Sequence, residues 1–282
     1  MNWRTLVTCD ELAATLGKKG VVVVDCRFDQ RDPAAGERAY LTGHIPGALY
    51  AHLERDLSDL SKTGGGRHPL PTAPDICGRL GRWGIDPSTQ VVAYDGADGA
   101  YAARLWWLLR SLRHENVAVL DGGLSAWTAG GKALDKSVPR PKATAYSARF
   151  NVRSVASIAV LAARMANQSG SLIDARAPER FRGEIEPIDR VAGHIPGGVN
   201  RHYAKNLDRQ GRFKSPEALR KEFDTMLKGQ PATDTVHMCG SGVTACHNVL
   251  AMDHAGLPGS RLYAGSWSEW IADPHRPVAK GA

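Results

Sequence analysis

Short runs of apolar residues alternate with longer segments of mixed character along the whole chain. The first half has three runs of nearly continuous apolar sequence, which are typical of strands that are buried on both faces: Val21–Val24, Gln90–Tyr94 and Val117–Leu120. Three similar runs occur in the second half: Leu172–Ile173, Thr235–Met238 and Arg261–Tyr263. The pattern therefore predicts buried strands in both halves of the chain.

Two of the longer segments, Tyr101–Leu112 and Ala245–Met252, have apolar residues at helical spacing. Strands that alternate with helices predict an α/β fold with mostly parallel sheets and helices on both faces, because parallel strands are joined by crossover helices. In such folds ligands bind beyond the carboxyl ends of the strands. We therefore look for functional residues directly after each predicted strand.

Three sequence landmarks occur twice, in the same order and at nearly the same spacing. The pairs are Gly43–Gly47 and Gly193–Gly197 (both GHIPG), Asp25–Arg27 and Asp174–Arg176, and Leu120–Trp127 and Tyr263–Trp270. Repeated landmarks in one order indicate two copies of a single domain. We expect an N-terminal domain over residues 1–135, a linker over 136–150 with prolines and charges, and a C-terminal domain over 151–282.

Composition narrows the class of protein further. With 43% hydrophobic and 23% charged residues among 282, the chain is typical of a globular protein. Its net charge of +7 is scattered rather than gathered in one run, which favours small anions over nucleic acid as partners. We see no apolar run long enough for a membrane and no signal-peptide pattern. Five scattered cysteines argue against a disulfide framework, so we expect a cytoplasmic protein. We also expect the chain to be a monomer or a weak dimer.

A cysteine lies between a predicted strand and a predicted helix. Cys239 follows Thr235–Met238 and opens the segment CGSGVT, with helical sequence from Ala245 onwards. The start of a helix offers free N–H groups and a positive dipole end, and two glycines let the backbone curl around the sulfur. Such surroundings favour the thiolate, which is the nucleophilic form of cysteine. The pattern predicts that Cys239 is a reactive nucleophile rather than a packing residue.

The first copy provides an internal comparison. Aligning Gln90–Tyr94 with the strand before Cys239 puts Asp95 at the position of the cysteine. A carboxylate cannot act as a sulfur nucleophile and repels anions from the same loop. The sequence therefore predicts one reactive site per chain, in the second copy, and a catalytically silent first domain.

The chain resembles the tandem-domain rhodanese sulfurtransferases, and most closely their 3-mercaptopyruvate branch. The resemblance is carried by the cysteine loop, both GHIPG segments and the string GSWSEW (Gly265–Trp270). The resemblance covers nearly the whole chain. It implies transfer of a sulfane sulfur from 3-mercaptopyruvate or thiosulfate, through a persulfide on Cys239, to cyanide, a thiol or reduced thioredoxin. It implies no cofactor. The loop residues Gly240, Gly242, Val243 and Thr244 would then surround the substrate.

Both donors are anions, so a cation is needed to bind them. Arg180 falls on the family's carboxylate-binding arginine, and a guanidinium group binds a carboxylate through two parallel hydrogen bonds. The mercaptopyruvate branch usually has a second arginine nine residues further on. Here that position is Asp189, and Arg190 beside it is our candidate for the second arginine. This departure leaves thiosulfate open as the donor.

The same branch uses a loop serine with a histidine and a carboxylate from the first domain. Ser241 matches the serine, His68 fits the histidine and Glu54 fits the acid by its distance from His44. Such a set of residues could supply the proton that the leaving enolate needs. If it does, the active site lies between the two domains.

Other functions fit the sequence less well. A cysteine phosphatase or arsenate reductase would need an arginine that closes the loop, and none lies between Cys239 and Asn248. A zinc site is disfavoured because His237, Cys239, Cys246 and His247 lack the usual ligand spacing. A non-catalytic sulfur carrier remains an alternative, and continued turnover would distinguish an enzyme from it.

Overall fold

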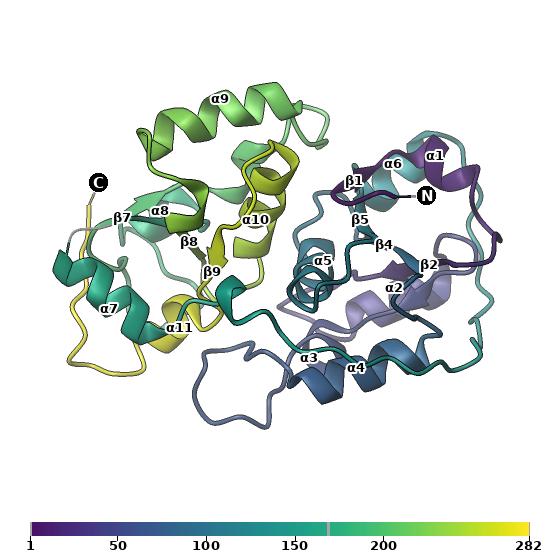
Figure 1. Ribbon diagram of the computed structural model, residues 1–282, viewed down its shortest axis with the longest axis horizontal. Helices are drawn as coiled ribbons and strands as arrows, with labels where there is room; N and C mark the ends of the chain where they lie inside the picture. Colours follow the sequence, from purple (N-terminus) through teal and green to yellow (C-terminus); the bar gives the residue numbers. More distant parts are fainter. Residues whose placement is uncertain (1, 168–169, 282) are drawn as a thin grey trace. The chain divides into compact units, whose positions relative to one another are not determined.

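The computed structural model describes residues 2–167 and 170–281, and these form two compact units (Figure 1). Unit 1 comprises Met1–Asp59, Pro71–Asn151 and Arg209–Phe213. Unit 2 comprises Leu60–Leu70, Val152–Asp208 and Lys214–Ala282. The units are thus not consecutive stretches of chain, because each contains a short segment from within the sequence of the other.

The sheet of unit 1 has five parallel strands in the order β1-β5-β4-β2-β3. The strands are β1 (Leu6–Val7), β2 (Val21–Asp25), β3 (Leu49–Tyr50), β4 (Gln90–Tyr94) and β5 (Val117–Leu120). β4 is buried along its whole length, which agrees with its continuous apolar sequence. The loop after β4, where Asp95 lies, is therefore at the carboxyl edge of the sheet.

The described part of unit 1 also contains six helices. They are α1 (Cys9–Ala13), α2 (Ala35–Thr42), α3 (Leu53–Asp56), α4 (Ala73–Arg82), α5 (Ala102–Ser111) and α6 (Gly123–Ala129). Val92 and Tyr94 of β4 pack with Leu12 of α1 and Trp127 of α6 in one core cluster. α5, which contacts β4 and β5, lies on the other side of the strands (Figure 1).

Unit 2 repeats this design with four parallel strands in the order β7-β6-β8-β9. The strands are β6 (Ser171–Asp174), β7 (Gly198–Asn200), β8 (Thr235–Met238) and β9 (Arg261–Leu262). Val155 forms a parallel bridge with Leu262, at the sheet edge where unit 1 has β1. The cysteine-bearing loop follows β8, a central strand.

The helices of unit 2 also lie on both faces. They are α7 (Ile158–Asn167), α8 (Pro178–Phe181), α9 (Pro216–Leu227), α10 (Ala245–His254) and α11 (Ser266–Trp270), with 3₁₀ turns η1 (Val152–Ser154), η2 (Tyr203–Asn206) and η3 (Ala232–Asp234). Val236 and Met238 of β8 pack with Trp267 and Trp270 of α11. His237, which alternates with them, contacts Met252 of α10.

The predicted α/β class, with two parallel sheets and covering helices, is confirmed. Residues 136–150 contain no helix or strand. The placing of domain boundaries at that linker stays a prediction, since the compact units interleave at Leu60–Leu70 and Arg209–Phe213. In the described part of the chain no helix is both long and apolar enough to cross a bilayer.

Candidate active site

Cys239 follows β8 directly, at the carboxyl end of the sheet of unit 2. Its side chain is 2% exposed, and its Sγ accepts a hydrogen bond from the N–H of Gly242 at 3.1 Å. Its own N–H donates to Oγ of Ser266 at 3.0 Å. The loop therefore curls back over the sulfur, and a backbone donor already points at the atom that would carry negative charge.

Gly242 makes this curl possible. Its φ of +77° lies in the left-handed region, and a Cβ there would come within 2.2 Å of the carbonyl oxygen of Ala264. No side chain fits between the two backbones. Beyond it, the carbonyls of Val243 and Thr244 accept hydrogen bonds from Cys246 (3.0 Å) and His247 (3.2 Å), which leads the loop into α10.

The start of α11 holds the other side of the loop. Trp267 N–H donates to the carbonyl of Cys239 at 3.0 Å, and Ser268 N–H donates to that of Gly240 at 2.9 Å. Unit 1 has the same pattern, because the N–H groups of Leu124 and Ser125 donate to the carbonyls of Asp95 and Gly96, each at 2.9 Å. The two loops are thus anchored alike.

The loop of unit 1 differs in what it surrounds. Asp95 is buried, and its carboxylate accepts hydrogen bonds from four N–H groups: Ala97 (3.2 Å), Gly99 (2.9 Å), Tyr101 (2.9 Å) and Ala102 (3.1 Å). Burial and the neighbouring Asp98 raise the pKa of Asp95 to about 6, while these N–H groups act in the opposite direction. The loop of unit 1 is an anion-binding loop that its own side chain fills.

Ser241 and His68 are hydrogen-bonded in unit 2. Oγ of Ser241 lies 2.7 Å from Nδ1 of His68, and the histidine is 3% exposed. His68 belongs to the segment Leu60–Leu70, which is part of unit 2 although it lies early in the sequence. A Cβ on Gly66 would come within 2.3 Å of the carbonyl of Gly265, so this segment packs directly on the backbone before α11.

Arg180, at the end of α8, is held by two carboxylates. Its Nε and Nη2 donate to Glu186 at 2.7–3.2 Å, and its Nη2 also reaches Asp189 at 3.1 Å. Although burial raises the pKa of Glu186, its hydrogen bond with Arg180 contributes to a net shift below the ordinary value. Within the described residues Nη1 of Arg180 has no partner, and it lies 3.8 Å from the position that a Cβ on Gly240 would take.

A second guanidinium group lies beside the loop, and sequence reasoning missed it. Arg67 forms an ion pair with Asp189, and its Nη2 lies 3.0 Å from the Cβ position of Gly240. Arg67 N–H also donates to Oγ of Ser268 at 3.0 Å. The residue directly precedes the predicted His68 and follows three glycines, a signal that could have drawn attention to it.

Arg190 and Glu54 are the two remaining predicted site residues. Arg190 donates to the carbonyls of Ile271 (2.6 Å) and Ala272 (3.2 Å), at the end of α11. Glu54 lies in α3 of unit 1. The roles given to Arg190 and Glu54 stay predictions.

The histidines near the cysteine belong to the packed interior. Burial lowers the pKa of His237 to about 3, so its ring is neutral at physiological pH. His247 lies 3.0 Å from the amide of Asn206, and Cys246 donates to the carbonyl of Gly242 at 3.3 Å. These contacts give each side chain a structural role.

The repeated fold, with one buried cysteine at a strand–helix junction and guanidinium groups beside it, defines a two-copy α/β enzyme of the sulfur-transferring class. The chain belongs to the rhodanese family, because the model of the rhodanese-like domain matches residues 8–130 and 157–273. It is a tandem-domain sulfurtransferase of the 3-mercaptopyruvate or thiosulfate type.

Named relatives span the full chain. A probable 3-mercaptopyruvate sulfurtransferase from Pseudomonas aeruginosa is 48% identical over 100% of both chains. A putative thiosulfate sulfurtransferase, SseB, from Mycobacterium tuberculosis is 38% identical over 99% of this chain and 98% of its own. The solved structure of 3-mercaptopyruvate sulfurtransferase from Leishmania major is 29% identical, with a TM-score of 0.84 over 95% of this chain and 74% of that one.

Proposed function

We propose that the chain transfers sulfur from 3-mercaptopyruvate to a thiophilic acceptor through a persulfide on Cys239. The observation that carries this proposal is the 2.7 Å hydrogen bond between His68 and Ser241, two residues beyond the cysteine. A proton-transferring pair is needed when the leaving group is an enolate, and sulfite needs none. The name of the Pseudomonas aeruginosa relative supports the same donor.

The first step forms one bond and breaks one. The thiolate of Cys239 attacks the sulfur of the donor, an S–S bond forms, and the C–S bond breaks with its electron pair going to carbon. The carbon fragment leaves as the enolate of pyruvate, and the thiol proton of the donor is passed to it through Ser241 and His68. Sulfur is oxidised by this step and carbon is reduced, so no outside oxidant or reductant is needed.

The loop stabilises charge on sulfur during both steps. The N–H of Gly242 already donates to Sγ, and a persulfide would extend into the same loop. Fixed donors of this kind stabilise developing charge without reorganising, as in an oxyanion hole. The acceptor, which is cyanide, a thiol or reduced thioredoxin, then removes the outer sulfur and regenerates the thiolate.

Two arginines bind the carboxylate of the donor. Arg180 offers Nη1 and Arg67 offers Nη2, and both lie beside Gly240, the residue next to the cysteine. Asp189 forms ion pairs with Nη1 of Arg67 and Nη2 of Arg180, so it holds the two guanidinium groups together and leaves Nη2 of Arg67 and Nη1 of Arg180 for a donor beside Gly240. Arg67 therefore supplies the second cation that position 189 lacks.

The test is steady-state turnover on 3-mercaptopyruvate and thiosulfate side by side, with cyanide as the common acceptor. We expect kcat/KM to favour 3-mercaptopyruvate, and Cys239→Ser to abolish transfer from both donors with an unchanged circular dichroism spectrum. After incubation with donor alone, mass spectrometry should show one added sulfur atom on Cys239. Undiminished turnover by Cys239→Ser would refute the persulfide mechanism.

Thiosulfate is the second candidate donor. The same pair of guanidinium groups can bind a sulfonate, and the Mycobacterium tuberculosis relative is named for thiosulfate. A ratio of kcat/KM that favours thiosulfate would keep Cys239, Arg180 and Arg67 in their roles. It would exclude proton transfer by Ser241, His68 and Glu54 from the main reaction.

A further inference from the structure

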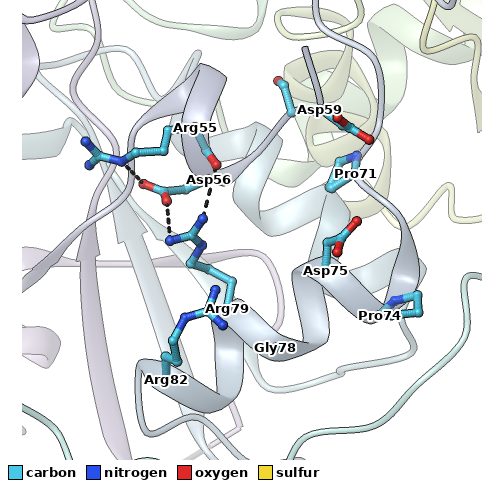
Figure 2. Close-up of a pocket in the computed structure, with 10 residues that line it drawn as sticks. Arg55, Asp56, Asp59, Pro71, Pro74, Asp75, Gly78, Arg79 and Arg82 are labelled. Carbon is cyan, nitrogen blue, oxygen red and sulfur yellow. Dashed lines mark hydrogen bonds and ion pairs between the residues drawn. The ribbon is translucent and has the colours of Figure 1, made fainter. Parts of the chain in front are cut away.

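Unit 1 contains a cavity of about 320 Å³ between α3, α4 and the chain around Pro71 (Figure 2). This volume is at the lower end of small-molecule sites, so the cavity suits one small ligand. Its lining includes three arginines and three aspartates: Arg55, Arg79, Arg82, Asp56, Asp59 and Asp75. The cavity lining therefore contains as many basic as acidic side chains.

Part of this charge is already paired within the protein. Asp56 is buried, forms ion pairs with Nη1 of Arg79 at 2.8 Å and Nε of Arg55 at 3.5 Å, and accepts a hydrogen bond from the N–H of His52 at 2.7 Å. Arg55 also reaches Glu37. These contacts build a rigid wall of the cavity and leave other charged groups to face a ligand.

Arg82 and Asp75 are the charges that the protein does not pair. Among residues 2–167 and 170–281, the guanidinium of Arg82 has no hydrogen bond or ion pair. The carboxylate of Asp75 accepts a hydrogen bond from the hydroxyl of Thr72, and no basic group of the described chain lies within ion-pair distance of it. One positive and one negative side chain of the described residues therefore line the cavity without forming an ion pair with each other.

Gly78 leaves room between them. Residues 75, 78 and 82 lie on one face of α4, and Nη1 of Arg82 reaches back to 3.5 Å from the position that a Cβ on Gly78 would take. Gly78 lies three positions after Asp75, roughly 4.5 Å along the helix axis. Figure 2 shows Arg79 and Arg82 on one side of the cavity and Asp75 with Pro71 on the other.

A buried hydroxyl provides an independent sign of a ligand. Ser58 lines the cavity and is 6% exposed, yet its Oγ has no hydrogen-bond partner in the described part of the protein. Buried polar groups are nearly always hydrogen-bonded, because leaving one unpaired is costly. A bound molecule with a polar atom at this position would satisfy the hydroxyl.

We propose that this cavity binds a small α-amino acid as a zwitterion, with its carboxylate on Arg82, its ammonium group on Asp75 and a hydrogen bond to Ser58. A simple anion is repelled by the aspartates, and a simple cation by the arginines, whereas a zwitterion complements both. The site gives a ligand-binding role to the unit that lacks the reactive cysteine. The α-keto acid donor has no ammonium group, so the site excludes it.

The test is an NMR titration of the full-length protein, following backbone amide shifts, with L-alanine as the probe. Propionate and ethylamine, which each lack one of its two charged groups, are the matched ligands. We expect saturable shifts at Gly78 and Arg82 with L-alanine, and a Kd at least tenfold lower than for either analogue. Equal affinity for propionate would overturn the proposal in favour of an anion site, and the absence of saturable shifts would overturn it outright.

Variants locate the site. Arg82→Gln and Asp75→Asn should each raise the Kd for L-alanine at least tenfold, whereas Arg140→Gln, an exposed arginine of unit 1 outside the cavity, should leave it unchanged. Ser58→Ala should weaken binding but raise the thermal midpoint of the free protein, because it removes an unpaired buried hydroxyl. Unchanged affinity in both charge variants would show that L-alanine binds elsewhere, which overturns the proposal.

Discussion

Replacing Arg67 by Gln tests our proposal that this residue is the second cation of the donor site. The change removes the ion pair with Asp189 and the charge beside Gly240, while Asp189 keeps its contact with Arg180. A charge-assisted hydrogen bond to a donor carboxylate contributes about 1.5–3 kcal/mol. At 1.4 kcal/mol for each factor of ten, kcat/KM should fall about 10- to 100-fold.

The kinetic pattern matters as much as the size of the effect. The carboxylate of the donor does not react, so a contact with it should be equal in the ground state and the transition state, and we expect KM to rise and kcat to stay nearly constant. Initial rates of thiocyanate formation over a range of 3-mercaptopyruvate concentrations, with cyanide in excess, measure both constants. Arg67→Lys keeps the charge but loses the planar fork, so its KM should lie between those of the wild type and Arg67→Gln.

Arg190→Gln provides the comparison, because the sequence alone favours Arg190 as the second arginine. If Arg67 has that role, Arg190→Gln should change stability through its contacts at Ile271 and Ala272 and leave KM within about twofold. A folded Arg67→Gln enzyme with wild-type kcat/KM would refute the assignment, and a large rise in KM for Arg190→Gln would return the role to Arg190.

Three further predictions follow from the site and its counterpart in unit 1. Ser241→Ala should lower kcat with 3-mercaptopyruvate by about 100-fold and change turnover of thiosulfate little, since general acid–base catalysis contributes about 10²–10⁴; equal losses with both donors would contradict proton transfer by this pair. Gly242→Ala should lower the free energy of unfolding by more than about 2 kcal/mol in urea titrations, because a Cβ would overlap the carbonyl of Ala264; a neutral result would show that the loop can relax. Burial raises the pKa of Asp95 to about 6, above that of an unfolded aspartate, so its contribution to stability is present at low pH and is lost as the pH rises through 6. The unfolding free energy of the wild type minus that of Asp95→Asn should therefore grow by about 2 kcal/mol between pH 7 and pH 4.5, and a constant difference would contradict this.

Long buried strands could be predicted from the sequence almost to the residue. β4, β5 and β8 have the predicted bounds, because strands buried on both faces require continuous apolar runs. The strands β1, β3 and β7 have only two or three residues each. Segments that short carry no detectable periodicity, so their positions depend on the sheet they join.

The cysteine loop could be recognised in the sequence because its residues are consecutive, whereas the groups that we propose bind the donor are not. Arg67 and Asp189 lie far apart in the sequence and form an ion pair in unit 2. Nothing in the local pattern around Arg67 indicates that Leu60–Leu70 joins the second unit. That placement depends on tertiary packing, including the close approach of Gly66 to Gly265.

The four N–H groups around the carboxylate of Asp95 have a consequence for the other copy of the loop. In unit 1 the group that orders the loop is the covalently attached carboxyl of Asp95, which never leaves the loop. In unit 2 the proposed mechanism puts the corresponding charge on sulfur, and the charge moves from Sγ to the outer sulfur and back in every turnover. By that mechanism the transferred atom would also be a structural ligand, and the loop around Cys239 should exchange its amide hydrogens more slowly when the enzyme is loaded with sulfur than when it is empty.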